Sequence, residues 1–529
     1  MGYEEVITLL GDFGKYQKRI YFLLCLPAVI CAFHKLGNVF ILAEPEQRCL
    51  IPGESPDALF KLNHTTFEQY YPWDSTNGKF SSCQIILDNK TQYCDKYIYD
   101  HSVYGYTTVT EWDLTCSKTY LIATTNALFM VGVMLGSIIF GDLSDRYGRK
   151  IIFFISLILQ VTCGTLASFA PEFWTFSFLR LIVGATTSGV FLVAYVIALE
   201  MVSPSKRPVA GTVCQMFFSL GYMLTAVFAI YIHNWRNLQL AISLPGVLFI
   251  CYWWFIPESV RWLISKKKIT EAKILIQRAA KENNVKVSDD VLNELLVSDI
   301  VKTKNNGERD ASVFDILKYP NMRKRAAIIF FDWYACNITY YGLSWSTNNL
   351  VGNPYLNFIL SGAVELPAYT FLILVLNRWG RKKVQCGCMI TAGISLLLSI
   401  IIPDDMPILI VTSAMIGKLA VTSAYGTIYI FSTEQFPTVI RNAGLGAGST
   451  CARFGSIMAP YINVLNKIWT PLPLVIFGSI TLIGGVLSLL LPETLNKKLP
   501  ETMEEGESFG MKKSEIQVME EEPLNDVKV

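Results

Sequence analysis

The segment GDLSDRYGRK, residues 141–150, separates two apolar runs at residues 120–140 and 151–170. Each run is long enough to cross a bilayer as a helix, whereas the segment between them carries too many charges to lie inside one. We therefore expect a short loop at a membrane face, in which both glycines let the chain turn. Its three basic residues place the loop on the cytoplasmic side. A segment that only fixes topology is the simpler alternative.

The composition extends this interpretation to the whole chain. Hydrophobic residues make up 52% of the 529 residues and charged residues 17%, against about 25% charged residues in soluble domains. About twelve apolar runs approach the ~20 residues that span a bilayer. We therefore predict an all-α membrane protein with twelve transmembrane helices.

Several other classes of protein are disfavoured. The net charge is +2 and no long basic run lies outside the loops, so no nucleic-acid partner is expected. No nucleophile, zinc-protease or phosphate-loop motif is found, and only 4 histidines are present, so we predict no enzyme activity, no metal site and no cofactor.

Three sequence motifs recur in the second half of the chain, in the same order and at nearly one spacing. RYGR begins at Arg146 and RWGR at Arg378, and PES is followed by PET at almost the same interval. A third pair starts at Glu200 and Glu434. Such a repeat predicts two six-helix halves that rock about a site between them. The predicted parts are a cytosolic segment 1–19, a half at 20–256, a cytosolic linker 257–325, a second half at 326–491, and a largely disordered cytosolic tail 492–529.

Residues 43–118 form a long polar segment that we predict to be extracellular. Four cysteines in one exported segment suggest two disulfides, with three possible pairings. Two glycosylation sequons share this segment. The residues concerned are Cys49, Cys83, Cys94 and Cys116, with Asn63 and Asn89.

The motif at 141–150 resembles the signature loop between the second and third helices of the major facilitator superfamily. Further stretches resemble the organic cation, organic anion and carnitine carriers of solute carrier family 22, including insect-type organic cation transporters. They are EWDLTC at 111–116, PESVRWL at 257–263, YYGLS at 340–344, PTVIRNAGLG at 437–446 and PETLNKKLPET at 492–502. This resemblance implies a plasma-membrane carrier of small organic ions, which we expect to work as a monomer. The positive charges of the short loops predict that both termini are cytosolic.

Two charges inside apolar runs are the leading site candidates, since an intramembrane charge is costly unless it is paired or hydrated. Glu365 is expected to attract a substrate cation, and a glutamate there matches the cation and carnitine carriers. Arg453 is suited to a substrate carboxylate and matches the carnitine and anion carriers. For either residue the alternative is a structural ion pair, between Arg453 and Glu365 or Asp332. A zwitterionic substrate satisfies both positions, and so does a cation carrier whose arginine is neutralised by a neighbouring residue.

Aromatic and polar residues are expected to complete the site, because ammonium groups bind aromatic faces. Packing without a role in binding is the alternative for each. The candidates are Trp333, Tyr340, Tyr195, Gln215, Phe218, Tyr369 and Tyr425. In the outer half of the first helix, Lys35 is expected to extend toward the interface, and His34 to titrate or to be a satisfied polar residue. Cys31 replaces an asparagine linked to sodium in carnitine carriers, which argues against sodium coupling.

The resemblance also implies gating residues, which would form charge clusters at the cytoplasmic face. They are Asp145, Arg146, Arg149, Glu200, Arg378, Arg381, Glu434 and Arg441. The predicted function is transport of small organic cations or zwitterions by alternating access. The alternatives are an organic anion carrier and a non-transporting receptor with the same fold.

Overall fold

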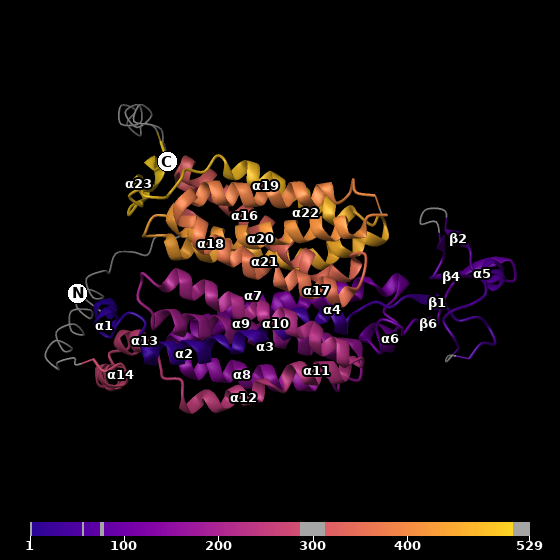
Figure 1. Ribbon diagram of the computed structural model, residues 1–529, viewed down its shortest axis with the longest axis horizontal. Helices are drawn as coiled ribbons and strands as arrows, with labels where there is room; N and C mark the ends of the chain where they lie inside the picture. The colour runs from indigo at the N-terminus through magenta and orange to yellow at the C-terminus, as the bar shows by residue number, and fades with distance from the viewer. Residues whose placement is uncertain (1–2, 56–57, 75–78, 286–312, 404, 512–529) are drawn as a thin grey trace, which may run out of the picture.

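The computed structural model describes residues 3–55, 58–74, 79–285, 313–403 and 405–511. Long helices run side by side along one axis, as Figure 1 shows. The segment between the first two spans projects from one end of this bundle, which we call the disulfide end. At the opposite, terminal end lie α1 (Tyr3–Leu9), α14 (Ile269–Glu282) and α23 (Met503–Ser508).

The bundle consists of two halves, drawn in indigo to magenta and in orange to yellow in Figure 1. The first half contains α2 (Lys15–Cys25), α3 (Pro27–Leu36), α4 (Asn38–Ile41), α7 (Tyr120–Tyr147), α8 (Arg149–Ala167), α9 (Phe173–Glu200), α10 (Arg207–Tyr231), α11 (Trp235–Ser243), α12 (Gly246–Ile250) and the 3₁₀ helix η2 (Cys251–Trp254). The second contains α16 (Pro320–Trp345), α17 (Pro354–Ala363), α18 (Glu365–Trp379), α19 (Arg381–Leu398), α20 (Pro407–Gln435), α21 (Arg441–Val464) and α22 (Leu472–Ser488). Helix α3 packs on α10 as α16 packs on α21, in line with the sequence repeat.

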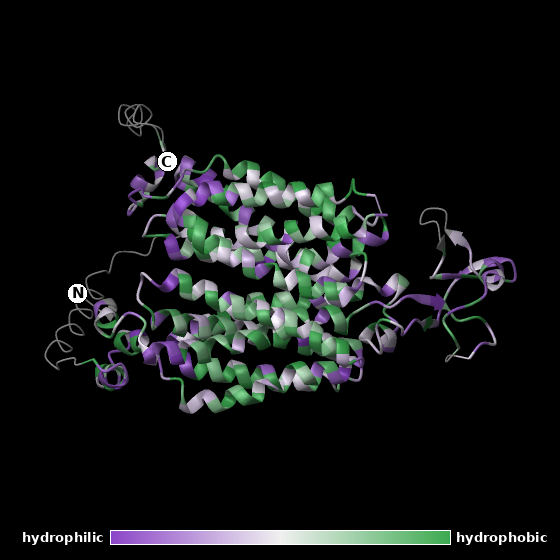
Figure 2. Ribbon diagram, in the orientation of Figure 1, coloured by the Kyte–Doolittle hydropathy of each residue, from purple (hydrophilic) through white to green (hydrophobic). Residues whose placement is uncertain are grey.

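Within the described residues, nine helical segments are long and apolar enough to cross a membrane. They are Lys15–Ile41, Cys116–Tyr147, Arg149–Ala167, Phe173–Glu200, Arg207–Tyr231, Trp235–Trp254, Pro354–Trp379, Pro407–Gln435 and Leu472–Leu490. Helices α16, α19 and α21 run between these spans but carry more polar residues. Figure 2 shows apolar residues along the bundle and hydrophilic residues gathered at its ends.

The predicted loop at 141–150 is largely helical, so that prediction was wrong. Helix α7 continues to Tyr147, and Gly141 lies inside it. The extra turns are stabilised by an ion pair of 2.8 Å from Arg146 Nε to Asp142 Oδ2, one helical turn apart. Only Gly148, with φ +114°, makes the turn before α8. Gly380, with φ +92°, makes the equivalent turn before α19.

After each of these turns, a glutamate carboxylate from a distant part of the chain binds the N-terminus of the next helix. Glu258 Oε1 accepts hydrogen bonds from the backbone N–H groups of Arg149 and Lys150, at 3.0 and 3.1 Å. Glu493 likewise accepts from the N–H groups that begin α19, at 2.9 Å from Arg381 and 3.2 Å from Lys382. Negative charge stabilises the free donors at a helix N-terminus. Burial alone would raise the pKa of Glu493, but these backbone donors hold it below its usual value.

Two membrane segments are broken near the level of the candidate site. The span Lys15–Ile41 divides into α2, α3 and α4, and the span Pro354–Trp379 into α17 and α18. The second break falls at Val364, because the proline at 367 has no N–H to bond the carbonyl of Ala363. Glu365 is therefore the first residue of α18.

The segment at the disulfide end is small and cross-linked. It contains β1 (Gln47–Cys49), α5 (His64–Tyr70), β2 (Trp73–Asp74), β3 (Lys79–Phe80), β4 (Gln84–Leu87), β5 (Lys90–Tyr93), β6 (Tyr97–Tyr99), α6 (Thr108–Trp112) and η1 (Cys116–Lys118). The antiparallel pairs are β1–β6, β2–β3 and β4–β5. Of the three pairings left open, the structure has Cys49–Cys94 and Cys83–Cys116. Both predicted sequon asparagines are exposed, one before α5 and one in the β4–β5 turn.

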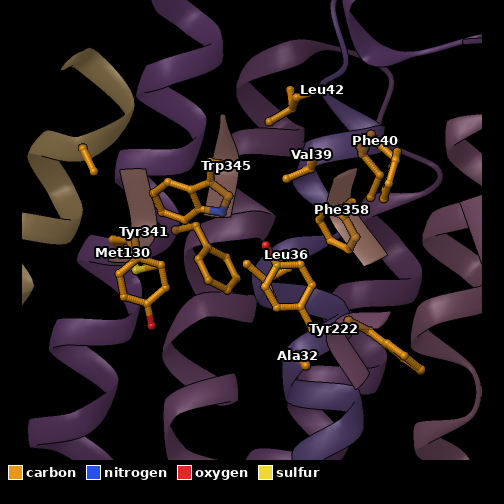
Figure 3. Packing of buried hydrophobic residues seen from close by; sticks show 14 of the residues in the cluster. Ala32, Leu36, Val39, Phe40, Leu42, Met130, Tyr222, Tyr341, Trp345 and Phe358 are labelled. Atoms are coloured by element: carbon orange, nitrogen blue, oxygen red, sulfur yellow. The ribbon is translucent and has the colours of Figure 1, made fainter. Parts of the chain in front are cut away.

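An apolar core joins the two halves toward the disulfide end (Figure 3). Phe40 of α4 lies 4.8 Å from Phe358 of α17, between ring centres, and Tyr222 of α10 lies 4.5 Å from the same ring. Polar contacts reinforce it: Lys467 Nζ lies 2.5 Å from Glu44 Oε1, and Asn348 Nδ2 donates to the Val39 carbonyl at 2.7 Å.

The beginning of the predicted disordered tail is folded, which corrects that prediction for residues 492–511. Helix α23 packs on α16, and Glu507 accepts hydrogen bonds from the N–H groups of Asn321 and Met322, both at 2.9 Å. Residues 512–529 lie outside the described part, as does 286–312 of the linker.

Candidate functional site

Glu365 lies where the two halves meet and is completely buried. Its carboxylate accepts a hydrogen bond of 2.6 Å from Tyr340 of α16 and another of 2.6 Å from Ser219 of α10. Since α10 belongs to the first half and α18 to the second, this one side chain contacts both halves.

The carboxylate already has a counter-ion, but it is a lysine and not the arginine that the sequence suggested as the alternative. Lys418 of α20 places its Nζ 3.2 Å from Glu365 Oε1, and its side chain is only 2% exposed. The same ammonium lies 3.5 Å from the ring centre of Tyr340 and donates to Ser344 Oγ. A buried ion pair with such additional partners is well satisfied, but losing either member leaves an uncompensated charge.

Arg453 of α21 and Lys35 of α3 are the other charges at the centre of the interface. Both side chains are half-buried. The Nε of Arg453 is buried and has no hydrogen-bond partner among the described residues. Among the described residues neither cation forms an ion pair, so the expected alternative of Arg453 paired with Glu365 or Asp332 is not found. Asp332 instead accepts a hydrogen bond of 2.5 Å from Ser488.

The predicted aromatic residues divide into two groups. Tyr340 and Tyr425 stack, with ring centres 5.7 Å apart, and the buried Tyr369 lies one helical turn from Glu365 on α18. Phe218 contacts Lys35. Trp333, by contrast, is fully buried and contacts Ser432 and Tyr429. It therefore packs against residues of α20 and is closed to solvent.

The remaining two candidates lie on the first half, toward the terminal end. Tyr195 of α9 stacks on Phe191 of the same helix, with ring centres 6.1 Å apart. Gln215 of α10 is half-buried, one helical turn from Ser219.

The predicted gating residues form matching clusters within each half. Arg149 Nε lies 3.0 Å from Glu200 Oε2, and Arg381 Nε lies 3.0 Å from Glu434 Oε2. Asp145, whose side chain is 68% exposed, lies 3.2 Å from Arg149. Of the other predicted members, Arg146 pairs with Asp142, Arg378 is exposed and Arg441 is half-buried.

Several residues of the site were missed from the sequence. Glu365 was selected because it is a single charge inside an apolar run. Lys418 meets the same criterion and could have been selected in the same way. Ser219, Tyr341 and Tyr429 carry no such signal, because their roles depend on which faces the helices present. Among the described residues, no group of three His, Cys, Asp or Glu side chains is placed to hold a metal ion.

Two helical halves in a membrane, with charged and aromatic side chains where they meet, define a secondary transporter. A family model described as "Sugar (and other) transporter" matches residues 79–505. The chain is 56% identical to an organic cation transporter protein of Drosophila melanogaster, over 98% of this chain and 97% of the relative. It is 35% identical to mouse solute carrier family 22 member 21, over 96% and 93%.

The chain therefore belongs to the sugar (and other) transporter family of the major facilitator superfamily, and within it to solute carrier family 22. It is a multi-pass membrane transporter and not an enzyme. Human organic cation/carnitine transporter 2 is 34% identical, over 95% of this chain and 93% of the relative. The predicted major facilitator fold, though not the number of twelve helices, is confirmed by the similarity to an inward-open structure of the xylose transporter XylE of E. coli, with a TM-score of 0.64, 15% identity and coverage of 94% of this chain and 100% of the other.

Proposed function

We propose that this transporter carries small organic cations or zwitterions across the plasma membrane, with Glu365, Lys418 and Arg453 at the centre of its substrate site. The names of the relatives support the substrate class, since one is an organic cation transporter and another an organic cation/carnitine transporter. The observation that carries the proposal is the buried Glu365, which contacts Ser219 in one half and Tyr340 in the other. A group that binds there acts on both halves at once, as alternating access requires.

The proposal includes twelve membrane spans, with both termini in the cytosol and residues 43–118 outside. The positive charges of the short connections at the terminal end support this orientation. The disulfides at the opposite end are consistent with an oxidising exterior. We further propose that the protein works as a monomer in the bilayer, because a single chain supplies both halves of the site.

Uptake of labelled substrates tests the proposal. Proteoliposomes that contain the purified protein would be supplied with tetraethylammonium, carnitine or para-aminohippurate. Saturable uptake of the first or second, above that of empty liposomes, is expected. Glu365→Gln would serve as the site variant, and Asp12→Asn, in the turn after α1, as the matched loss of one carboxylate elsewhere. Uptake of para-aminohippurate alone, unaffected by Glu365→Gln, would instead identify an organic anion carrier.

A further inference from the structure

A cavity of about 330 Å³ lies at the terminal end of the first half, and none of its lining residues belongs to the candidate substrate site. It is formed where two membrane spans end, since Lys150 is in the first turn of α8 and Trp254 is the last residue of the span Trp235–Trp254. The helix α14, which lies at the terminal end (Figure 1), contributes Ile274 and Arg278. The volume is within the range of small-ligand sites, about 300–1,000 Å³.

The apolar side chains of this cavity are open to the surroundings. Trp254 is 74% exposed and Phe255 62%, and in the same cavity Ile274 of α14 is 59% exposed. In membrane proteins, tryptophan residues at the end of a span lie at the level of the lipid headgroups. The exposed apolar surface of the cavity is therefore placed to contact lipid.

Two basic side chains line the same cavity. The ammonium group of Lys150 lies 4.6 Å from the ring centre of Trp253, and Arg278 is exposed. Neither forms a salt bridge with any residue that the structure describes. A cation on the face of an indole ring keeps its N–H donors, so both side chains are available to an anionic ligand.

Two acidic residues also line the cavity, but both already have partners. Glu258 accepts hydrogen bonds from the backbone N–H groups of Arg149 and Lys150, as described above. Glu271 Oε1 lies 3.3 Å from Lys268 Nζ, one helical turn away. The acids of the cavity are therefore engaged by a helix N-terminus and by a lysine outside the cavity, and the charges of Lys150 and Arg278 remain for a ligand.

We propose that this cavity binds an anionic phospholipid of the leaflet at the terminal end, with its phosphate between Lys150 and Arg278. Its acyl chains would lie along the exposed apolar side chains of the cavity. The inference rests on the orientation proposed above, in which this leaflet faces the cytosol and carries the anionic lipids. A lipid bound there connects the end of the membrane bundle to α14 of the linker.

Lipid titrations of the purified full-length protein in detergent test the inference, with the shift in melting temperature as the readout. The probes are dioleoyl phosphatidylglycerol, dioleoyl phosphatidylcholine, which has no net charge, and glycerol phosphate, which has the phosphate without acyl chains. The variants are Lys150→Gln, Arg278→Gln, both together, Lys150→Arg and Trp254→Ser. Lys118→Gln, an exposed lysine at the disulfide end, is the control. Where a variant is less stable without lipid, the amount of phosphatidylglycerol that co-purifies replaces the melting temperature.

We expect phosphatidylglycerol to act on the wild type at lower concentrations than phosphatidylcholine, and glycerol phosphate to have no effect. Each of Lys150→Gln and Arg278→Gln should raise the half-maximal concentration of phosphatidylglycerol about fivefold, and the double variant about thirtyfold. Phosphatidylcholine should be unaffected by these variants. Lys150→Arg and Lys118→Gln should behave as the wild type, and Trp254→Ser should weaken both lipids.

Three results would overturn the inference. The first is an equal effect of phosphatidylglycerol and phosphatidylcholine on the wild type. The second is a preference for phosphatidylglycerol that survives in the double variant, which would place the lipid elsewhere. The third is a response to glycerol phosphate as strong as that to the lipid, which would identify a soluble phosphate ligand. The assay uses neither uptake nor a transported substrate, so its failure is distinct from a failure of the proposed transport function.

Discussion

Lys418 Nζ lies 3.2 Å from Glu365 Oε1 in a position closed to solvent, so the acid at the centre of the protein is held as one member of an ion pair. Lys418→Met should leave the carboxylate unpaired and destabilise the protein by about 3–5 kcal/mol. The double variant Glu365→Gln/Lys418→Met should recover most of this loss, because it removes both charges. Thermal unfolding in detergent measures the effect. A double variant no more stable than Lys418→Met would show that the two charges do not compensate each other.

The turns at the terminal end should tolerate no side chain. An added Cβ at Gly380 would meet the Glu493 carboxylate, and the positive φ is itself unfavourable for other residues. We expect Gly380→Ala to destabilise the protein by about 1–2 kcal/mol, with a similar effect at Gly148. Gly446→Ala is the control, because a Cβ there has open space around it and no positive φ. Equal melting temperatures for Gly380→Ala and Gly446→Ala would contradict this prediction.

The charge clusters should differ in importance according to their burial. The side chains of Glu200 and Glu434 are 11% and 17% exposed, whereas that of Asp145 is 68% exposed. Exposed pairs contribute only about 0–1 kcal/mol. We therefore expect Glu434→Gln to lower the maximal rate of uptake severalfold and Asp145→Asn to lower it less, at equal surface expression. A larger loss of rate in Asp145→Asn than in Glu434→Gln would mean that the exposure of a charged side chain does not decide its contribution to transport.

The segment at the disulfide end should lose stability in acid. Hydrogen bonds from Arg48 hold the pKa of Glu54 below its usual value. Its carboxylate therefore stabilises the folded segment above the unfolded pKa of about 4.3, and this contribution is lost as the pH falls through the lower folded pKa. Hydrogen exchange of residues 47–54, corrected for the intrinsic effect of pH, should show faster opening below pH 4. Glu54→Gln should remove this pH dependence; if it persists, another group is responsible.

The orientation of the chain can be read from glycosylation. Asn63 and Asn89 are exposed, so both should carry glycans if this segment faces the exterior. Glycosidase treatment should increase the mobility of the wild type on a gel and leave Asn63→Gln/Asn89→Gln unchanged. A wild type that does not shift, from a glycosylating host, would place the segment on the other side.

The long-range repeat and the apolar runs were sufficient to predict the fold. Each run can cross a membrane by itself, and this property depends on local composition. The motifs at Arg146 and Arg378 also predicted that these two residues lie at equivalent positions in the two halves. They could not show that α7 continues to Tyr147. Helix ends depend on contacts such as that of Arg146 with Asp142, which compete with the turn tendency of nearby glycines.

The site was only partly predictable, because its pairing depends on how the halves pack. Glu365 and Arg453 were found as charges in apolar runs. Which cation meets Glu365 depends on the rotation of α20 about its axis, and a contact between two helices distant in sequence leaves no local pattern. Lys35 was assigned to the membrane interface because it lies toward one end of its helix, but the contact with Tyr341 places it against the second half.

The docking of α23 has a practical consequence for work with this protein. Glu507 occupies the backbone donors that begin α16, and Arg325 of that helix donates to the Gly506 carbonyl. A fluorescent or affinity tag is therefore best fused beyond Met511, where the described chain ends. A shortened version that stops at Pro500 would remove this cap and expose a helix that contributes Trp333, Tyr340 and Tyr341 to the centre of the transporter.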